Sequence, residues 1–164
     1  MRLSPIVLAL GLAASSAAVP VLGQAPDDQI NPRSTALLKQ GETALAAGRF
    51  NDAEDAFETS LAVDPRNRKA FIDLGRTAQR QKLFGQAIRF YNKALALEPN
   101  DLDALSAQGT AMVELGALSP ARNNLAKLQK ICASGCAQAT TLAAAIARGP
   151  SVAAIKPPPT PKAN

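Results

Sequence analysis

The apolar and small residues of this chain recur every 34 positions between residues 37 and 125. Small, aromatic and aliphatic residues each keep one register in successive units of the pattern. The recurring positions are Gly41, Gly75 and Gly109; Ala53, Ala87 and Ala121; Phe57, Tyr91 and Leu125; Leu37, Phe71 and Leu105; and Pro65 and Pro99. A fixed period of this length is typical of arrays whose units bury their apolar faces against one another. The pattern therefore predicts three stacked units.

Turn and cap residues divide each unit into two predicted helices. Helices are expected to end just before Pro65 and Pro99, because the residue before a proline disfavours helical backbone. Asp101 and Ser119 are predicted to cap the helices that follow them. The turn inside each unit falls at Gly48, Lys82 and Gly116.

The glycines at the centre of the first predicted helices need a structural reason. A glycine inside a helix costs up to ~1 kcal/mol relative to alanine, and here the cost is repeated three times. Close packing of two helix backbones supplies a reason. We expect the recurring alanines of the second helices to face these glycines, and Phe57, Tyr91 and Leu125 to fill the space toward the next unit.

This pattern of a large apolar residue, glycine, alanine, an aromatic and proline resembles the tetratricopeptide repeat family. The match is strong in the first two units. It is weaker in the third, where Ala133 replaces the proline and Leu125 the aromatic residue. The resemblance implies an all-α fold, a right-handed α-solenoid of three helix–turn–helix repeats with a C-terminal capping helix.

The resemblance also divides the chain into segments. A linker at 24–33 precedes the repeat domain at 34–149, which is followed by a Pro-rich tail at 150–164 that favours extended backbone. The domain contains repeats 34–67, 68–101 and 102–135 and a capping helix at 136–149. In that helix one face is apolar, and it comprises Ala139, Leu142, Ala143 and Ile146.

The first 23 residues have the pattern of a secretory signal peptide. Arg2 precedes an apolar run from Ile6 to Ala14, and small residues follow. Cleavage is expected after Gly23, with Ala18 as the alternative site. We therefore expect a periplasmic or secreted protein. The region around the cleavage site contains no cysteine that could be acylated, so we do not expect a lipoprotein. An uncleaved segment would instead be a membrane anchor.

Cys132 and Cys136 are the two cysteines of the chain. In an oxidising compartment we expect them to form a disulfide, which would fix the turn into the capping helix and contribute about 2 kcal/mol. The alternative is a redox pair in a small thiol–disulfide protein. Redox motifs usually have two residues between the cysteines, whereas three lie between these.

The composition disfavours catalysis and nucleic-acid binding. The chain has no histidine, which excludes Ser/His and Cys/His nucleophile pairs and the commonest metal ligand. The net charge of +5 is spread without a dense basic block. We therefore expect no enzyme activity, no cofactor, no metal and no nucleic-acid partner.

What remains is the concave face that the family resemblance implies, where the first helices of successive repeats bind peptides or helices. The residues expected to line it are Leu38, Glu42, Leu45, Lys69, Ile72, Asp73, Arg76, Gln79, Arg80, Asp103, Ser106, Thr110 and Val113. Lys69, Asp73, Arg76 and Arg80 share one helix face. This face is either a basic centre for an acidic peptide, with Leu38 and Ile72 as apolar contacts, or a solvated strip that pairs its own charges.

Family members that hold the acidic tails of cytosolic heat-shock chaperones use Lys, Asn and Arg in this groove. Here the matching positions are Leu38, Glu42, Asp73, Asp103 and Ala107, which speaks against that role. We expect a non-enzymatic adaptor or scaffold with a protein or peptide partner and possible weak self-association. The alternatives are the thiol–disulfide protein and a membrane-anchored envelope assembly factor.

Overall fold

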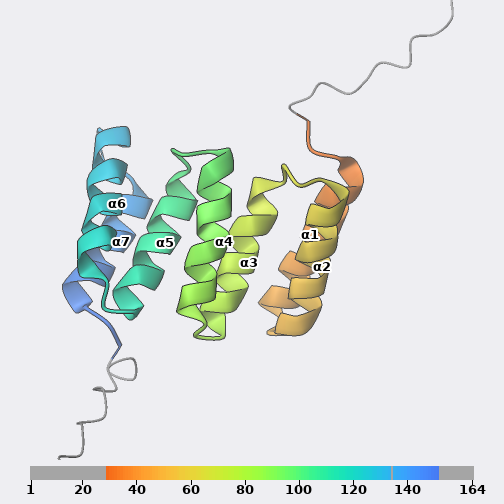
Figure 1. Ribbon diagram of the computed structural model, residues 1–164, viewed down its shortest axis with the longest axis horizontal. Helices are drawn as coiled ribbons and strands as arrows, with labels where there is room; N and C mark the ends of the chain where they lie inside the picture. Colours follow the sequence, from red (N-terminus) through yellow and green to blue (C-terminus); the bar gives the residue numbers. More distant parts are fainter. Residues whose placement is uncertain (1–28, 134, 152–164) are drawn as a thin grey trace, which may run out of the picture.

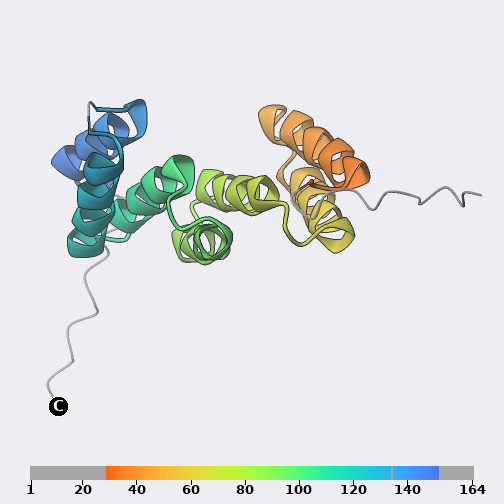
Figure 2. The same ribbon diagram turned by 90° about the horizontal axis from the view of Figure 1, so that it is seen from above.

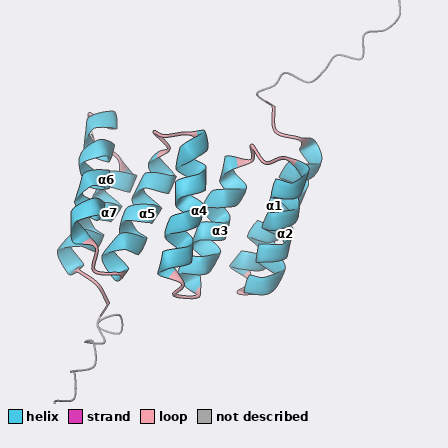
Figure 3. Cartoon of the chain, in the orientation of Figure 1, coloured by secondary structure: helices cyan, strands magenta, loops and turns pink. Residues whose placement is uncertain are grey.

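The computed structural model describes residues 29–133 and 135–151, and all regular secondary structure in these residues is α-helical (Figure 3). The helices are α1 (Pro32–Ala46), α2 (Phe50–Val63), α3 (Arg68–Arg80), α4 (Phe84–Leu97), α5 (Leu102–Glu114), α6 (Leu118–Ile131) and α7 (Ala137–Arg148). The predicted all-α class is confirmed. The predicted signal peptide at 1–23, residues 24–28 of the predicted linker and the tail after Ser151 lie outside the described residues.

The helices stand side by side in one row, with α1 and α7 at opposite ends (Figure 1). Each helix contacts the next, and α1, α3, α5 and α7 also contact one another in succession. Seen from above, the row is bent, so that α1 and α7 lie on one side and α4 on the other (Figure 2). This bend gives the array an inner face along α1, α3, α5 and α7. In the described part of the chain, no helix combines the length and the apolar character needed to cross a lipid bilayer.

The helix ends agree in part with the predicted caps and prolines. The carboxylate of Asp101 accepts a hydrogen bond of 2.7 Å from the backbone N–H of Ala104 and caps α5. The helices α2 and α4 end before Pro65 and Pro99, with extended backbone at Asp64 and Glu98. The predicted cap at Ser119 is wrong, because α6 already begins at Leu118 without a side-chain cap.

The turn inside each pair requires a left-handed backbone. Gly48 and Gly116 adopt φ of 73° and 75°, and Lys82 adopts φ of 62° at the corresponding place in the second pair. Glycine tolerates this conformation, whereas a Cβ makes it costly. Lys82 is therefore a strained position that interrupts the repeat.

Large rings pack directly on two of the recurring glycines. A Cβ built on Gly41 would lie 2.4 Å from the ring of Phe57, and one on Gly75 would lie 2.5 Å from the ring of Tyr91. The expectation that the alanines of the second helices face the glycines is therefore wrong. Those alanines are fully buried. In the first two pairs, however, the aromatic residue one helical turn after the alanine covers the glycine of its own pair.

The third pair is completed by α7. A Cβ on Gly109 would lie 2.6 Å from Leu142 of α7, and Leu125 of α6 is not among its nearest atoms. Leu142 is fully buried, and Leu105 and Leu128 belong to the same apolar cluster. Leu142 therefore covers the third glycine, as Phe57 and Tyr91 cover theirs.

A buried polar cluster joins the first three helices. Ser34 and Ser60 each donate a hydrogen bond of 2.8 Å to the backbone carbonyl of the other, and the amide nitrogen of Asn67 lies 2.9 Å from the Ser34 hydroxyl. All three side chains are buried. Each polar atom has a partner, so the cluster fixes the approach of α1, α2 and α3 without an unsatisfied group. The sequence pattern did not indicate this cluster.

Cys132 and Cys136 form a disulfide between the end of α6 and the start of α7. Cys136 is the N-cap residue of α7. The other end of α7 is held by Glu114 of α5, whose carboxylate accepts hydrogen bonds of 3.0 and 2.6 Å from the backbone N–H and hydroxyl of Ser151 and lies 3.4 Å from Arg148. Both ends of α7 are thus fixed to the array.

Candidate functional site

Two adjoining hollows lie on the inner face of the array. One, of about 330 Å³, lies between α3, α5 and α7, and its lining residues are Arg76, Gln79, Asp103, Ser106, Ala107, Thr110, Ala137, Gln138 and Thr141. The other, of about 320 Å³, lies between α1 and α3, and its lining residues are Leu45, Arg76, Gln79 and Arg80. Because Arg76 and Gln79 line both, the hollows form one groove across four helices.

Ion pairs link α1, α3 and α5 beside this groove, and of their members only Arg76 and Asp103 line it. Asp73 is buried and lies 3.5 Å from the Lys69 ammonium and 2.7 Å from the Arg76 guanidinium. Lys69 also pairs with Glu42 of α1, and Arg76 lies 3.8 Å from Asp103 of α5. Of the two interpretations left open, these contacts favour the strip that pairs its own charges. Carboxylates from α1 and α5 add two further ion pairs to the two within α3.

Arg80 differs from the other cations of α3. It forms no ion pair with any carboxylate of the described residues, and its guanidinium carbon lies 5.7 Å from the centre of the Phe50 ring. Its side chain is exposed and borders the hollow between α1 and α3. An aromatic face attracts a cation but does not cancel its charge. Arg80 is therefore a groove cation without an ion-pair partner among the described residues.

The apolar contacts in the groove come from a residue other than the two expected. Leu38 and Ile72 are 6% and 4% exposed and belong to the core clusters, so the prediction that they contact a ligand is wrong. Leu45, which was also expected in the groove, is half-buried and lines the hollow. Helical spacing alone does not show which of two neighbouring leucines a following repeat will cover.

The helix α7 forms a wall of the groove as well as a cap. The Ser106 hydroxyl donates to the backbone carbonyl of Gln138, and the Gln138 amide donates to Asp103, each at 2.9 Å. The Thr110 hydroxyl donates to the carbonyl of Ser106 within α5. The sequence analysis placed Asp103, Ser106 and Thr110 in the groove but did not foresee residues of α7 beside them.

One groove side chain is held from behind by a buried tyrosine. The Tyr91 hydroxyl donates a hydrogen bond of 2.8 Å to the Oε1 atom of Gln79. Burial raises the pKa of Tyr91 well above its usual range, so the hydroxyl stays protonated and remains a donor. With Oε1 occupied, the Nε2 group of Gln79 has no acceptor among the described residues. Gln79 therefore offers an oriented N–H donor where the two hollows meet.

No group of three or more acidic or cysteine side chains among the described residues has the arrangement of a metal site. The inner face instead offers hydroxyls, amides, one free charge and a half-buried leucine. Such a surface is suited to binding another polypeptide, and its helices are braced by the ion pairs and hydrogen bonds just described.

Comparison with solved structures shows the same architecture. The first TPR of Spaghetti (RPAP3), bound to an HSP90 peptide, has a TM-score of 0.65 and 22% identity over 71% of this chain and 91% of that chain. PcrH in complex with the chaperone-binding region of PopD has a TM-score of 0.60 and 23% identity, covering 70% and 86%. The Yersinia enterocolitica type III secretion chaperone SycD with a peptide of the translocator YopD has a TM-score of 0.61 and 17% identity, covering 70% and 92%.

Among curated protein sequences, none matches the chain significantly. The sequence pattern of the family described as Tetratricopeptide repeat, in contrast, matches residues 38–119, which are half of the chain. The stacked helix pairs and the glycines covered by large side chains agree with this match. The chain belongs to the tetratricopeptide repeat family.

Proposed function

We propose that this protein is a non-enzymatic adaptor that binds a segment of a protein partner in the groove formed by α1, α3, α5 and α7. The observation that carries the proposal is the groove itself, in which two hollows of about 320 and 330 Å³ join at Arg76 and Gln79. A preformed concave surface with a few fixed polar groups binds a ligand at little ordering cost.

The solved structures of similar shape support this role. Those of Spaghetti, PcrH and SycD each contain a bound peptide or binding region of another protein. At these low sequence identities the similarity establishes a shared fold, but it does not indicate that this chain binds the same ligands. The Lys, Asn and Arg pattern expected for chaperone tails is missing at Leu38, Glu42 and Asp73, so we propose a different partner for this chain.

We further propose that the protein acts outside the cytoplasm. The support is the sequence pattern of residues 1–23, in which one positive charge, a short apolar run and small residues follow one another. The intact mass of the protein isolated from its own organism tests this. Loss of the first 23 residues, or of the first 18, supports export, whereas an intact N-terminus would favour an anchored protein.

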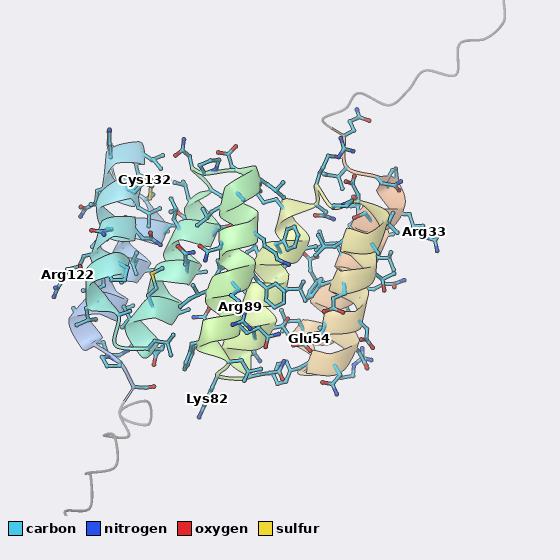
Figure 4. All side chains as sticks on the ribbon, in the orientation of Figure 1. Arg33, Glu54, Lys82, Arg89, Arg122 and Cys132 are labelled. Atoms are coloured by element: carbon cyan, nitrogen blue, oxygen red, sulfur yellow. A yellow bond between two sulfur atoms is a disulfide. The ribbon has the colours of Figure 1, made fainter. Side chains whose placement is uncertain are left out.

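Site-specific photo-crosslinking in the living organism tests the adaptor role. A photoreactive residue replaces Thr110, which lines the groove, and in a matched variant it replaces Arg122 (Figure 4), which is exposed on α6. We expect one discrete crosslinked protein with the Thr110 variant and none with the Arg122 variant. Crosslinking that is equal in both variants, or confined to Arg122, would contradict binding in the groove.

A further inference from the structure

Gln79 and Arg80 are neighbours in the sequence, and together they give the groove two unsatisfied binding groups. Gln79 lines both hollows, and Arg80 lines the hollow between α1 and α3 beside Leu45. The other charged groups in and beside the groove, from Glu42 to Asp103, already have partners of opposite sign. A ligand gains most from groups that have no partner in the free protein, because binding then breaks no existing interaction.

The geometry at Gln79 suits a main-chain carbonyl. Tyr91 is fully buried and donates to Oε1, which leaves the N–H groups of Nε2 as donors. A donor fixed by a buried partner loses little rotational freedom on binding. Main-chain carbonyls are the acceptors that every extended peptide presents at regular intervals. Gln79 therefore provides affinity that does not depend on the sequence of the ligand.

The geometry at Arg80 suits a carboxylate. The Phe50 ring lies 5.7 Å from the guanidinium carbon and supports one side of the group. Its N–H donors match the geometry of a carboxylate and form strong charge-assisted hydrogen bonds with one. Leu45 in the same hollow provides an apolar contact next to this charge. Arg80 therefore provides selectivity for an acidic side chain with apolar atoms beside it.

We propose that the groove binds an extended peptide segment, with Gln79 donating to one of its main-chain carbonyls and Arg80 pairing with an acidic side chain of the same segment. This inference rests on the proposed adaptor role and specifies the chemistry of its partner. In it, Gln79 and Arg80 contact the ligand, and Tyr91 is a positioning residue that acts through Gln79.

Selection from a library of random twelve-residue peptides displayed on phage, with the full mature chain as bait, tests the proposal. We expect the selected peptides to share an Asp or Glu at one position. Arg80→Gln should weaken binding of a selected peptide about tenfold, the loss of roughly one charge-assisted contact. Arg89→Gln is the matched control, because Arg89 is exposed on α4 and lines neither hollow (Figure 4). It should bind like the unaltered protein.

A double-mutant cycle tests the link to Tyr91. Tyr91→Phe keeps the ring on Gly75 but removes the hydroxyl, so it should weaken peptide binding several-fold while the helical circular dichroism is retained. In the Gln79→Ala background the same substitution should change the affinity little. An equal loss in both backgrounds would show that Tyr91 does not act through Gln79.

The outcomes separate this proposal from the adaptor role. If peptides bind and Thr110→Trp abolishes the binding, but no acidic residue is selected or Arg80→Gln behaves like Arg89→Gln, the specificity proposed here is wrong and the adaptor role stands. If no selected peptide is sensitive to Thr110→Trp, both proposals fail.

Discussion

Leu142 of α7 lies directly against Gly109 of α5, where a Cβ on the glycine would be 2.6 Å from a Leu142 methyl carbon. In the first two pairs the corresponding glycine is covered by Phe57 or Tyr91 of its own second helix. The third pair has the smaller Leu125 at that place, and Leu142 fills the space from the next helix. The capping helix therefore belongs to the core of the third repeat.

Leu142→Ala should destabilise the protein strongly. Leu142 is fully buried, and replacement of such a leucine by alanine costs about 2–5 kcal/mol. Urea unfolding followed by circular dichroism measures the loss. Adding Leu125→Phe should recover part of it, because the ring can take the place that Phe57 and Tyr91 take in the other pairs. A double variant less stable than Leu142→Ala alone would contradict this account.

Two glycine substitutions should act in opposite directions. Gly75→Ala places a Cβ against the Tyr91 ring at 2.5 Å and should lower the free energy of unfolding by about 1–3 kcal/mol. Gly85→Ala in α4 meets no atom within 4 Å and should raise it by up to ~1 kcal/mol. Chemical denaturation of both variants provides the comparison. Equal effects would show that the ring does not restrict Gly75.

Lys82→Gly should stabilise the protein. Lys82 has φ of 62° at the place where the other pairs have Gly48 and Gly116. Removing the Cβ relieves a cost of about 1–2 kcal/mol, from which the greater freedom of glycine in the unfolded chain subtracts up to ~1 kcal/mol. The melting temperature should rise with Lys82→Gly and stay unchanged with the control Lys82→Ala. A rise with both variants would point to the lysine charge as the cause.

Asp64 should make the stability depend on acid pH. Hydrogen bonds from the Arg66 side chain, and then from the backbone of Asn31 and Arg66, lower the pKa of Asp64 from 3.8 to about 2. A lowered pKa stabilises the folded state above the unfolded value, so this contribution is complete above about pH 4 and is lost as the pH falls toward 2. Asp64→Asn should remove this part of the pH dependence when unfolding is followed between pH 2 and 5. An unchanged slope would show that other carboxylates cause the acid sensitivity.

Reduction of the disulfide should loosen α7 selectively. Cys136 is the N-cap of α7, and Ala137, Gln138 and Thr141 line the groove just beyond it. Breaking the small loop with a dithiol reductant should lower the free energy of unfolding by about 2 kcal/mol. Amide hydrogen exchange should quicken in α7 and stay unchanged in α1 and α2. A uniform change over all helices would contradict a local role.

The sequence pattern was sufficient for the fold but not for the contacts between helices. The period of 34 residues and the prolines at 65 and 99 located the helix pairs, because both features are local in the sequence. Spacing within one helix also indicated the pairing of Asp73 with Lys69 and Arg76. The covering of Gly75 by Tyr91 depends on how two helices cross, which spacing does not encode.

The site was predicted less completely for the same reason. Glu42 and Asp103 pair with Lys69 and Arg76 from two other helices, so the charges of α3 alone could not decide between a basic centre and a self-paired strip. Likewise, Gln138 enters the groove because α7 packs on α5. Among the charged residues expected in the groove, all the first helices together provide three cations and three anions. This count would have predicted the charge of the groove better than the charge of α3 alone.

Hydrogen exchange of the full chain, free and bound to the partner identified by crosslinking at Thr110, tests the central claim most directly. The groove account predicts added protection along α1, α3, α5 and α7, with α2, α4 and α6 unchanged beyond the effect of general stabilisation. Protection concentrated on α2, α4 and α6, or confined to residues 150–164, would contradict it.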